Sequence, residues 1–189
     1  SLVSDEHVAA SRTIGEEGIV LLKNDNNTLP IDLNKTKTIA VVGENAIKAM
    51  TVGGGSSSLK VAKEVSPLEG LQNRVGDKAE ILYARGYVGD VNTSYNGVES
   101  GQNLVDNRGE DVLIAEAVEA ARRADVVIMF GGLNKASHQD CEDSDRYGLE
   151  LPYAQDKLMA ALVEANPNVV YVNISGNAVA MPWVDSVPA

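Results

Sequence analysis

The chain has 189 residues, 44% of them apolar, and its 16 basic and 27 acidic side chains give a net charge of −11. This length suits one domain with a sizeable buried core, and the acidic balance argues against nucleic acid or an anionic membrane as a partner, since both would repel the chain. No apolar run approaches the roughly 20 residues of a membrane-spanning helix, and the single cysteine, Cys141, excludes an internal disulfide or a zinc site of several thiolates.

The first predicted element is a helix over residues 4–22. Ser4 is placed to cap its N-terminus, and acidic residues follow in the first turn, where the helix dipole favours them. Glycines at 15 and 18 weaken the helical pattern. An apolar stripe runs along the segment and consists of Val8, Gly15, Ile19 and Leu22.

Four apolar runs further along the chain predict β-strands. The runs at 38–43, 126–130 and 169–174 are continuously apolar, which is typical of strands buried on both faces in a parallel sheet. The run at 79–84 alternates more and is expected nearer an edge.

Two helices are predicted between these strands. The helix over 110–123 begins with acidic residues and ends with two arginines, and the helix over 152–165 has a proline in its first turn. The expected buried faces are Ile114, Val118 and Ala121 in the first, and Ala154, Leu158, Leu162 and Ala165 in the second.

The order of these elements predicts the fold. Alternating strands and helices form right-handed crossovers that cover a sheet on both faces. We therefore expect one α/β domain over residues 1–189, a three-layer α/β/α sandwich with a mostly parallel sheet. Ligands bind such sheets at the carboxyl ends of the strands. Three polar segments leave that edge, at 43–46 with the later 53–58, at 131–151 and at 175–177.

A run of three glycines at 53–55 invites a phosphate-binding interpretation. A P-loop or dinucleotide turn needs spaced glycines directly after a strand, whereas these glycines are contiguous and lie ten residues past it. Backbone donors followed by three serines suit a neutral polyol better, because sugars are held by many uncharged hydrogen bonds.

The segment 132–146 is the densest polar cluster and contains four acidic residues, Asp140, Glu142, Asp143 and Asp145. One interpretation is a solvated acidic loop, with Asp145 and Arg146 as a structural ion pair. The other is that crowding raises the pKa of one carboxyl and makes it a proton donor near neutral pH. His138 is either a surface residue or a hydrogen-bond donor to a ligand. Cys141 is expected to be a packed thiol rather than a nucleophile, since no neighbouring pattern of His and base supports nucleophilic chemistry.

Several phrases of the sequence together resemble the C-terminal α/β domain of glycoside hydrolase family 3, the β-glucosidase and β-xylosidase type. They occur in register and cover essentially the whole chain. The phrases are residues 18–24 with 29–31, 39–46, 53–56 with 65–70, 142–146 with 149–152 and 155, and 173–179 with 182–183.

This resemblance implies a retaining β-glycosidase that acts on an oligosaccharide or glycoside. Its Asp nucleophile would lie on a preceding (β/α)8 barrel, and its acid/base carboxylate on a loop of the present domain, with the two carboxyls roughly 5–5.5 Å apart in the active site. No metal or cofactor is needed by this chemistry. Without the barrel, the 189 residues alone are expected to be inactive.

The best match for the acid/base residue of the family is Glu142, with Asp140 as the competitor. Asp143 departs from the glycine usual after that glutamate, although Asp tolerates a positive φ better than most residues. The residues expected to bind the sugar are Gly54, Ser56, His138 and Gln139.

Two alternatives to the catalytic interpretation remain, a non-catalytic carbohydrate-binding or scaffolding domain of the same fold and an unrelated nucleotide-binding domain. The resemblance also implies that relatives continue beyond residue 189 through another strand and helix, so the last elements are truncated here. Related enzymes are often exported, which predicts a periplasmic or secreted protein, although residues 1–6 show no signal peptide.

Overall fold

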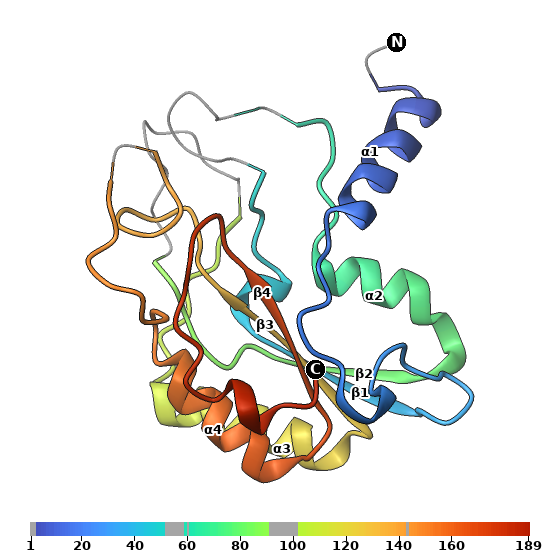
Figure 1. Ribbon diagram of the computed structural model, residues 1–189, viewed down its shortest axis with the longest axis vertical. Helices are drawn as coiled ribbons and strands as arrows, with labels where there is room; N and C mark the ends of the chain where they lie inside the picture. The colour runs from blue at the N-terminus through green and yellow to red at the C-terminus, as the bar shows by residue number, and fades with distance from the viewer. Residues whose placement is uncertain (1–2, 52–58, 60, 91–101, 143) are drawn as a thin grey trace.

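The structure is a computed structural model that describes residues 3–51, 59, 61–90, 102–142 and 144–189. Figure 1 shows the helices and strands arranged around one sheet. The elements are α1 (Asp5–Glu17), β1 (Thr38–Val42), α2 (Pro67–Val75), β2 (Glu80–Ala84), α3 (Glu110–Arg123), β3 (Val126–Gly132), α4 (Gln155–Ala165) and β4 (Val169–Ile174). None of the helices in these ranges is long and apolar enough to cross a membrane.

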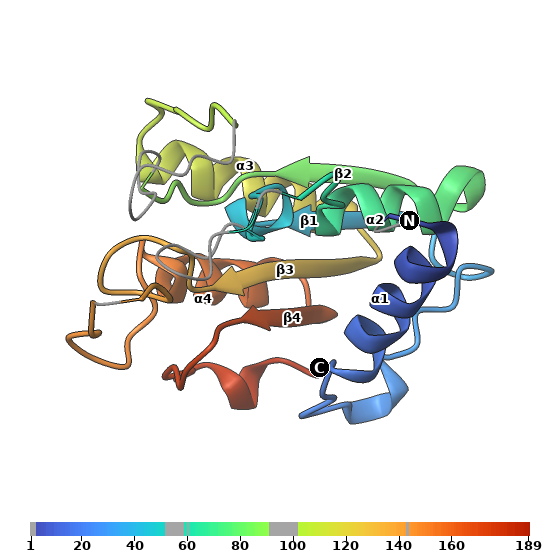
Figure 2. The ribbon, with the colours of Figure 1, turned by 90° about the horizontal axis from the view of Figure 1, so that it is seen from above.

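The four strands form one sheet in the order β2–β1–β3–β4, and all three pairings are parallel. The order can be followed in Figure 2. The alternating strand β2 lies at an edge, as predicted. The prediction for β4 is wrong in one respect, because only Val169 and Val170 are buried and the rest of the strand is half-buried. Within the described residues β4 is the last strand on its side of the sheet, and along its outer edge the backbone N–H of Tyr171 donates to the carbonyl of Ala189 at 2.9 Å.

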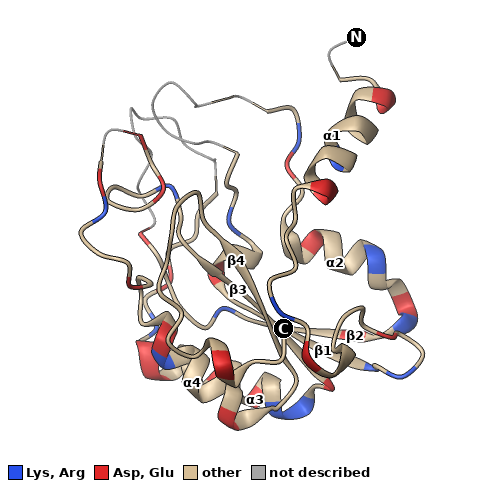
Figure 3. Cartoon of the chain, viewed as in Figure 1, with Lys and Arg blue, Asp and Glu red and all other residues tan. Residues whose placement is uncertain are grey.

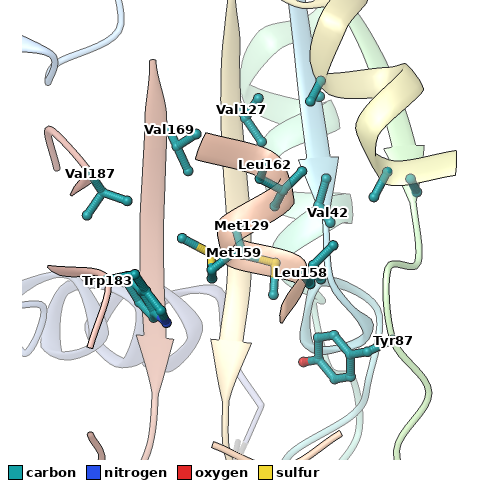
Figure 4. Close-up of a cluster of buried hydrophobic side chains, with 14 of the residues drawn as sticks. Val42, Tyr87, Val127, Met129, Leu158, Met159, Leu162, Val169, Trp183 and Val187 are labelled. Atoms are coloured by element: carbon teal, nitrogen blue, oxygen red, sulfur yellow. The ribbon is translucent and has the colours of Figure 1, made fainter. Parts of the chain in front are cut away.

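Apolar side chains pack on both faces of the sheet, which confirms the layered α/β fold. On one face α3 and α4 cover the strands, and Figure 4 shows part of this core. Its labelled members include Val42, Val127, Met129, Leu158, Met159, Leu162 and Trp183. On the other face, α2 and the segment 29–33 pack against residues such as Ile39, Val41 and Ile128.

Helix α3 has its predicted bounds, but its buried face is rotated by about one residue. Leu113, Ala117 and Ala121 are buried, whereas the predicted Ile114 and Val118 are half-buried on its flank. Figure 3 shows its acidic N-terminal turn and its basic C-terminal turn, an arrangement that stabilises the helix dipole.

Helix α4 begins at Gln155 rather than at Pro152, which corrects the predicted start. Tyr153 and Ala154 adopt left-handed backbone conformations with φ of 63° and 57°, so the right-handed helix starts after them. Leu158 and Leu162 are buried as predicted, whereas Ala154 and Ala165 are half-buried.

Helix α1 ends at Glu17 rather than continuing to Leu22. Ser4 caps it as predicted, by accepting the backbone N–H of His7 at 3.3 Å. No residue of α1 is buried, and the helix stands clear of the sheet in Figure 1. The predicted apolar stripe therefore does not pack within the described part of the chain, because Gly18 ends the helix and residues 19–22 are 61–78% exposed.

Candidate functional site

The carboxyl ends of β1 and β3 form the point at which the chain reverses its direction across the sheet. From β1 the chain reaches β2 through α2 on one face, and it then crosses to β3 through α3 on the other. Ligands of open α/β sheets bind at such switch points. Gly43 ends β1 with a φ of 114°, and a Cβ atom there would lie 2.0 Å from the carbonyl oxygen of Phe130, so only glycine fits.

A fully buried carboxylate, Glu44, lies two residues after the end of β1. It accepts hydrogen bonds from Nη2 of Arg85 at 2.8 Å and from the backbone N–H of Gly89 at 2.7 Å, and Nζ of Lys48 lies 3.5 Å away. A buried charge is stable only when it is paired and hydrogen-bonded. These contacts join the carboxyl ends of β1 and β2.

The loop from 133 to 151, which we call the acidic loop, leaves the carboxyl end of β3, and Figure 3 shows its acidic positions. Its first turn is closed by Asn134, whose backbone N–H donates to Oε1 of Gln139 at 2.9 Å and whose side chain accepts the N–H of Ala136 at 2.8 Å. The amide Nε2 of Gln139 donates to the hydroxyl of Tyr153. Gln139, expected to bind the sugar, is thus buried and bonded within the protein.

Asp140, the competing acid/base candidate, connects the acidic loop to the turn after β4. One carboxylate oxygen accepts a hydrogen bond from Nδ2 of Asn177 at 2.8 Å, and the other accepts the backbone N–H of Gly176. Nζ of Lys135 lies 4.0 Å away, and the Asp140 side chain is only 12% exposed. Both of its carboxylate oxygens therefore accept hydrogen bonds that hold the acidic loop against the turn after β4.

Glu142, two residues later, lies exposed on the same loop, while Cys141 is half-buried. Asp143 lies outside the described residues, and so do Gly54 and Ser56, which were expected to bind the sugar. Of the two acids that compete for the proton-donor role, Glu142 is the one presented to solvent.

His138, the remaining predicted sugar ligand, is held by its own loop. Nδ1 lies 2.8 Å from the carbonyl oxygen of Asp145 and 3.0 Å from Oγ of Ser144, and Nε2 lies 2.9 Å from the hydroxyl of Tyr147. The Tyr147 ring also stacks on the imidazole at 4.2 Å between centroids. Both ring nitrogens thus have partners inside the loop.

Arg146 fixes the C-terminal part of the acidic loop. Its guanidinium donates to Oδ1 of Asn177 at 2.9 Å, to the carbonyl of Glu150 at 2.9 Å and to the carbonyl of Ala178. Within the described residues these are its partners, and the predicted ion pair with Asp145 does not form. The N–H groups of the guanidinium donate instead to neutral amide and carbonyl oxygens.

In the described ranges, no group of three or more His, Cys, Asp and Glu side chains is arranged to hold a metal ion. The arrangement at this edge combines a rigid, bonded loop base with an exposed carboxylate. Such a carboxylate can exchange protons with a molecule bound against this face.

Residues 19–189 match the glycosyl hydrolase family 3 C-terminal domain. The chain belongs to glycoside hydrolase family 3. This domain is 44% identical to the β-glucosidase BoGH3A of Bacteroides ovatus, over 100% of the chain and 25% of that protein. It is 37% identical to a periplasmic β-glucosidase of Salmonella typhimurium, over 93% of the chain and 23% of that protein.

A solved structure extends this similarity to the fold. The family 3 β-glucosidase of Bifidobacterium adolescentis matches 100% of the chain and 24% of its own length, with a TM-score of 0.78 and 33% identity. The chain thus spans about a quarter of the length of the relatives it matches. The family 3 assignment drawn from the sequence phrases is confirmed, while the roles of individual residues in this family 3 domain stay predictions.

Proposed function

We propose that this domain supplies the acid/base carboxylate, Glu142, and part of the sugar-binding cleft to a retaining β-glycosidase. The nucleophile would be an Asp on a separate (β/α)8-barrel domain of the same protein. The observation that carries the proposal is the contrast between the two acids of the acidic loop. Asp140 is occupied by Asn177 and Gly176, whereas Glu142 is exposed on a loop whose base is fixed.

The chemistry requires a carboxyl that works in two directions. Glu142 first protonates the oxygen that leaves the sugar, while the nucleophile of the other domain forms the glycosyl–enzyme bond. The Glu142 carboxylate then removes a proton from the water that cleaves this bond. A rigid loop that carries an exposed acid suits this role, because the acid has to meet a second carboxyl from another domain.

β-Glucosides are the substrates best supported, because the relatives described above are named β-glucosidases. β-Xylosides are the second class. Comparing 4-nitrophenyl β-glucoside with the matching β-xyloside in the complete protein decides between them.

The test of the mechanism is Glu142→Gln in the complete protein that carries this domain. We expect the fold to be kept and turnover to fall by about 10²–10⁴-fold for aryl glucosides with poor leaving groups, because these depend most on protonation. Activated aryl glucosides should lose less, and added azide should restore their turnover, since azide attacks the glycosyl–enzyme without a general base. Glu150→Gln, another exposed acid of the same loop, is the control.

The isolated 189-residue domain provides a second test. It should not hydrolyse 4-nitrophenyl β-glucoside, because one carboxyl cannot perform a two-carboxylate reaction. Protein-dependent release of nitrophenol would contradict the two-domain mechanism.

We also propose that the complete protein is periplasmic or secreted. The support is the relative from Salmonella typhimurium, which is named a periplasmic β-glucosidase. Fractionation of the native cells, followed by detection with an antibody to this domain, tests the location, and a purely cytoplasmic signal would contradict it.

A further inference from the structure

Tyr153 lies in an unusual backbone conformation directly before α4. Its φ is 63°, and the next residue, Ala154, has a φ of 57°. A bulky side chain in the left-handed region is disfavoured and persists only where the surroundings hold it in place. The contacts of the Tyr153 side chain show what holds it.

The hydroxyl of Tyr153 joins three polar groups. It donates to Oδ2 of Asp90 at 2.8 Å, and it accepts from Nδ2 of Asn134 at 3.1 Å and from Nε2 of Gln139. A phenol has one proton and two acceptor positions, so all of its hydrogen-bonding capacity is used. Asn134 and Gln139 are both buried and form the base of the acidic loop.

The ring of Tyr153 makes a further contact, with the ring of Tyr87. It stacks on Tyr87 with centroids 6.1 Å apart and planes 7° from parallel. The hydroxyl of Tyr87 donates to the carbonyl of Phe130 and accepts the backbone N–H of Asn45, both at 3.3 Å. Tyr153 is therefore tied through Tyr87 to the carboxyl ends of β1 and β3.

Asp90, which accepts the hydrogen bond of the Tyr153 hydroxyl, is connected to the sheet through the adjacent residue, Gly89. The N–H of Gly89 donates to the buried carboxylate of Glu44 at 2.7 Å. Tyr153 thus connects the segment after β2 with the base of the acidic loop. Burial raises the pKa of Tyr153 to about 12, so its hydroxyl keeps its proton and continues to donate throughout the neutral range.

We propose that Tyr153 is a positioning residue, whose hydroxyl holds the base of the acidic loop and thereby the orientation of Glu142. This inference rests on the proposed function, and it adds a residue to that function. Gln139 lies three positions before Glu142, so loss of the hydroxyl frees the turn from which the acid extends. The strained backbone places the hydroxyl within reach of both partners on this turn.

The test is Tyr153→Phe in the complete protein, because this change keeps the ring and removes only the hydroxyl. We expect kcat for aryl β-glucosides with poor leaving groups to fall about tenfold, the effect of one lost hydrogen bond, with little change in KM. Amide hydrogen exchange at residues 134–142 should become faster by a similar factor, about tenfold. Tyr171→Phe is the matched control, because Tyr171 lies on β4 and, within the described part of the chain, its hydroxyl hydrogen-bonds to Oδ1 of Asn173 at 3.5 Å and not to the acidic loop.

Asp90→Ala provides a second variant, which removes the acceptor of the Tyr153 hydroxyl from an exposed position and leaves no cavity in the core. It should change exchange in the same direction by a smaller factor. Unchanged exchange and unchanged kcat in Tyr153→Phe, relative to Tyr171→Phe, would overturn the inference.

The kinetics of Glu142→Gln, measured in the same experiment, show whether a negative result for Tyr153→Phe also contradicts the proposed function. If Glu142→Gln shows the leaving-group-dependent loss and Tyr153→Phe matches its control, only the role of Tyr153 is lost. If Glu142→Gln has no effect, the proposed function is lost, and the exchange data still decide whether Tyr153 holds the loop.

Discussion

The carboxylate of Asp140 lies 2.8 Å from Nδ2 of Asn177, and this contact joins the loop after β3 to the turn after β4. The backbone N–H of Gly176 donates to the other oxygen. A carboxylate that accepts two protein donors in this way holds two segments together. The pairing therefore gives Asp140 a structural task, and this supports the proposal that the acid/base residue is the neighbouring Glu142.

Asp140→Asn should affect stability more than chemistry. The amide has one acceptor oxygen instead of two, so one of the donors from Asn177 or Gly176 loses its partner, and we expect the free energy of unfolding to fall by about 1–3 kcal/mol. Urea unfolding of the complete protein measures this change. Asp145→Asn, on the same loop, is the control.

The kinetic comparison with Glu142→Gln completes this test. Asp140→Asn should keep most of the turnover on activated and poor leaving groups alike. If it instead gives the leaving-group-dependent loss while Glu142→Gln is mild, the two roles are exchanged, and membership of family 3 is unaffected.

Asp125 makes the stability of the domain depend on pH. Its Oδ2 accepts the backbone N–H groups of Lys37 at 2.7 Å and Thr38 at 3.0 Å, and these hydrogen bonds lower the pKa of Asp125 in the folded state. A lowered pKa in the folded state means that the stabilisation is complete above the unfolded value of about 3.9 and is lost as the pH falls through the folded value.

We therefore expect Asp125→Asn to unfold at lower urea concentration than the parent at pH 7, with a difference that shrinks below about pH 4. Urea midpoints at pH 7 and pH 3 measure it. Glu119→Gln, on the exposed side of α3, controls for the loss of one negative charge. A difference that stays constant between the two pH values would show that the Asp125 hydrogen bonds do not depend on its ionisation.

The strands and two of the helices could be predicted from the sequence because burial on both faces of a parallel sheet leaves a local signal. The run at 126–130, for example, is continuously apolar, and every residue of β3 is buried. Helix ends were less predictable, since the start of α4 depends on the left-handed backbone at Tyr153 and Ala154, which no local pattern requires.

Helix α2 was missed although it carries a start signal. Ser66 accepts the N–H of Glu69 at 3.2 Å, and Pro67 occupies the first turn. These are the residues expected at a helix N-terminus. The helix is short, however, and the glycine at position 70 weakens its helical pattern. The N-terminal residues alone therefore do not predict a helix here.

The position of the acidic loop could be predicted, because it follows a buried strand at the ligand-binding edge. The separate roles of its residues could not, since they depend on contacts between distant segments. Asp140 meets Asn177, and Gln139 meets Tyr153, only after the sheet has formed. The same holds for Glu44 and Arg85, although an acid after β1 and a base after β2 would have suggested a pair at one sheet edge.

The buried charge of Glu44 should contribute strongly to the stability of the fold. In Glu44→Ala, the buried guanidinium of Arg85 loses its closest carboxylate, and the remaining one, Asp106, lies 3.7 Å away. Removing one partner of a buried pair costs about 3–5 kcal/mol. Chemical denaturation measures the loss.

The control is an exposed cluster of charges in which Nζ of Lys157 lies 2.7 Å from Oε1 of Glu110 and 2.9 Å from Oδ1 of Asp111. Lys157→Ala should cost at most about 1 kcal/mol, because water screens the exposed charges. Equal costs for Glu44→Ala and Lys157→Ala would contradict a structural role for the buried pair.

Gly89 lies where three segments of the site meet. A Cβ atom at this position would lie 2.7 Å from Oε1 of Glu44, 2.9 Å from Nδ2 of Asn134 and 3.1 Å from the ring of Tyr153. All three side chains make hydrogen bonds described above, so moving them aside would disturb those contacts. Gly89→Ala should therefore destabilise the domain by about 1–3 kcal/mol, the usual cost of an added methyl group in a packed interior, and it should also lower kcat, because it displaces the base of the acidic loop.

Gly70→Ala is the matched control for this change. Gly70 lies inside α2, and an added Cβ would meet only Cγ1 of Val65 at 3.9 Å, an ordinary contact. Alanine favours the helix there by about 0.5–1 kcal/mol, so this variant should be slightly stabilised with unchanged kcat. Gly89→Ala and Gly70→Ala thus have expected effects of opposite sign. A Gly89→Ala protein that unfolds at the parental urea concentration and retains the parental kcat would show that the three segments do not meet as closely as these distances require.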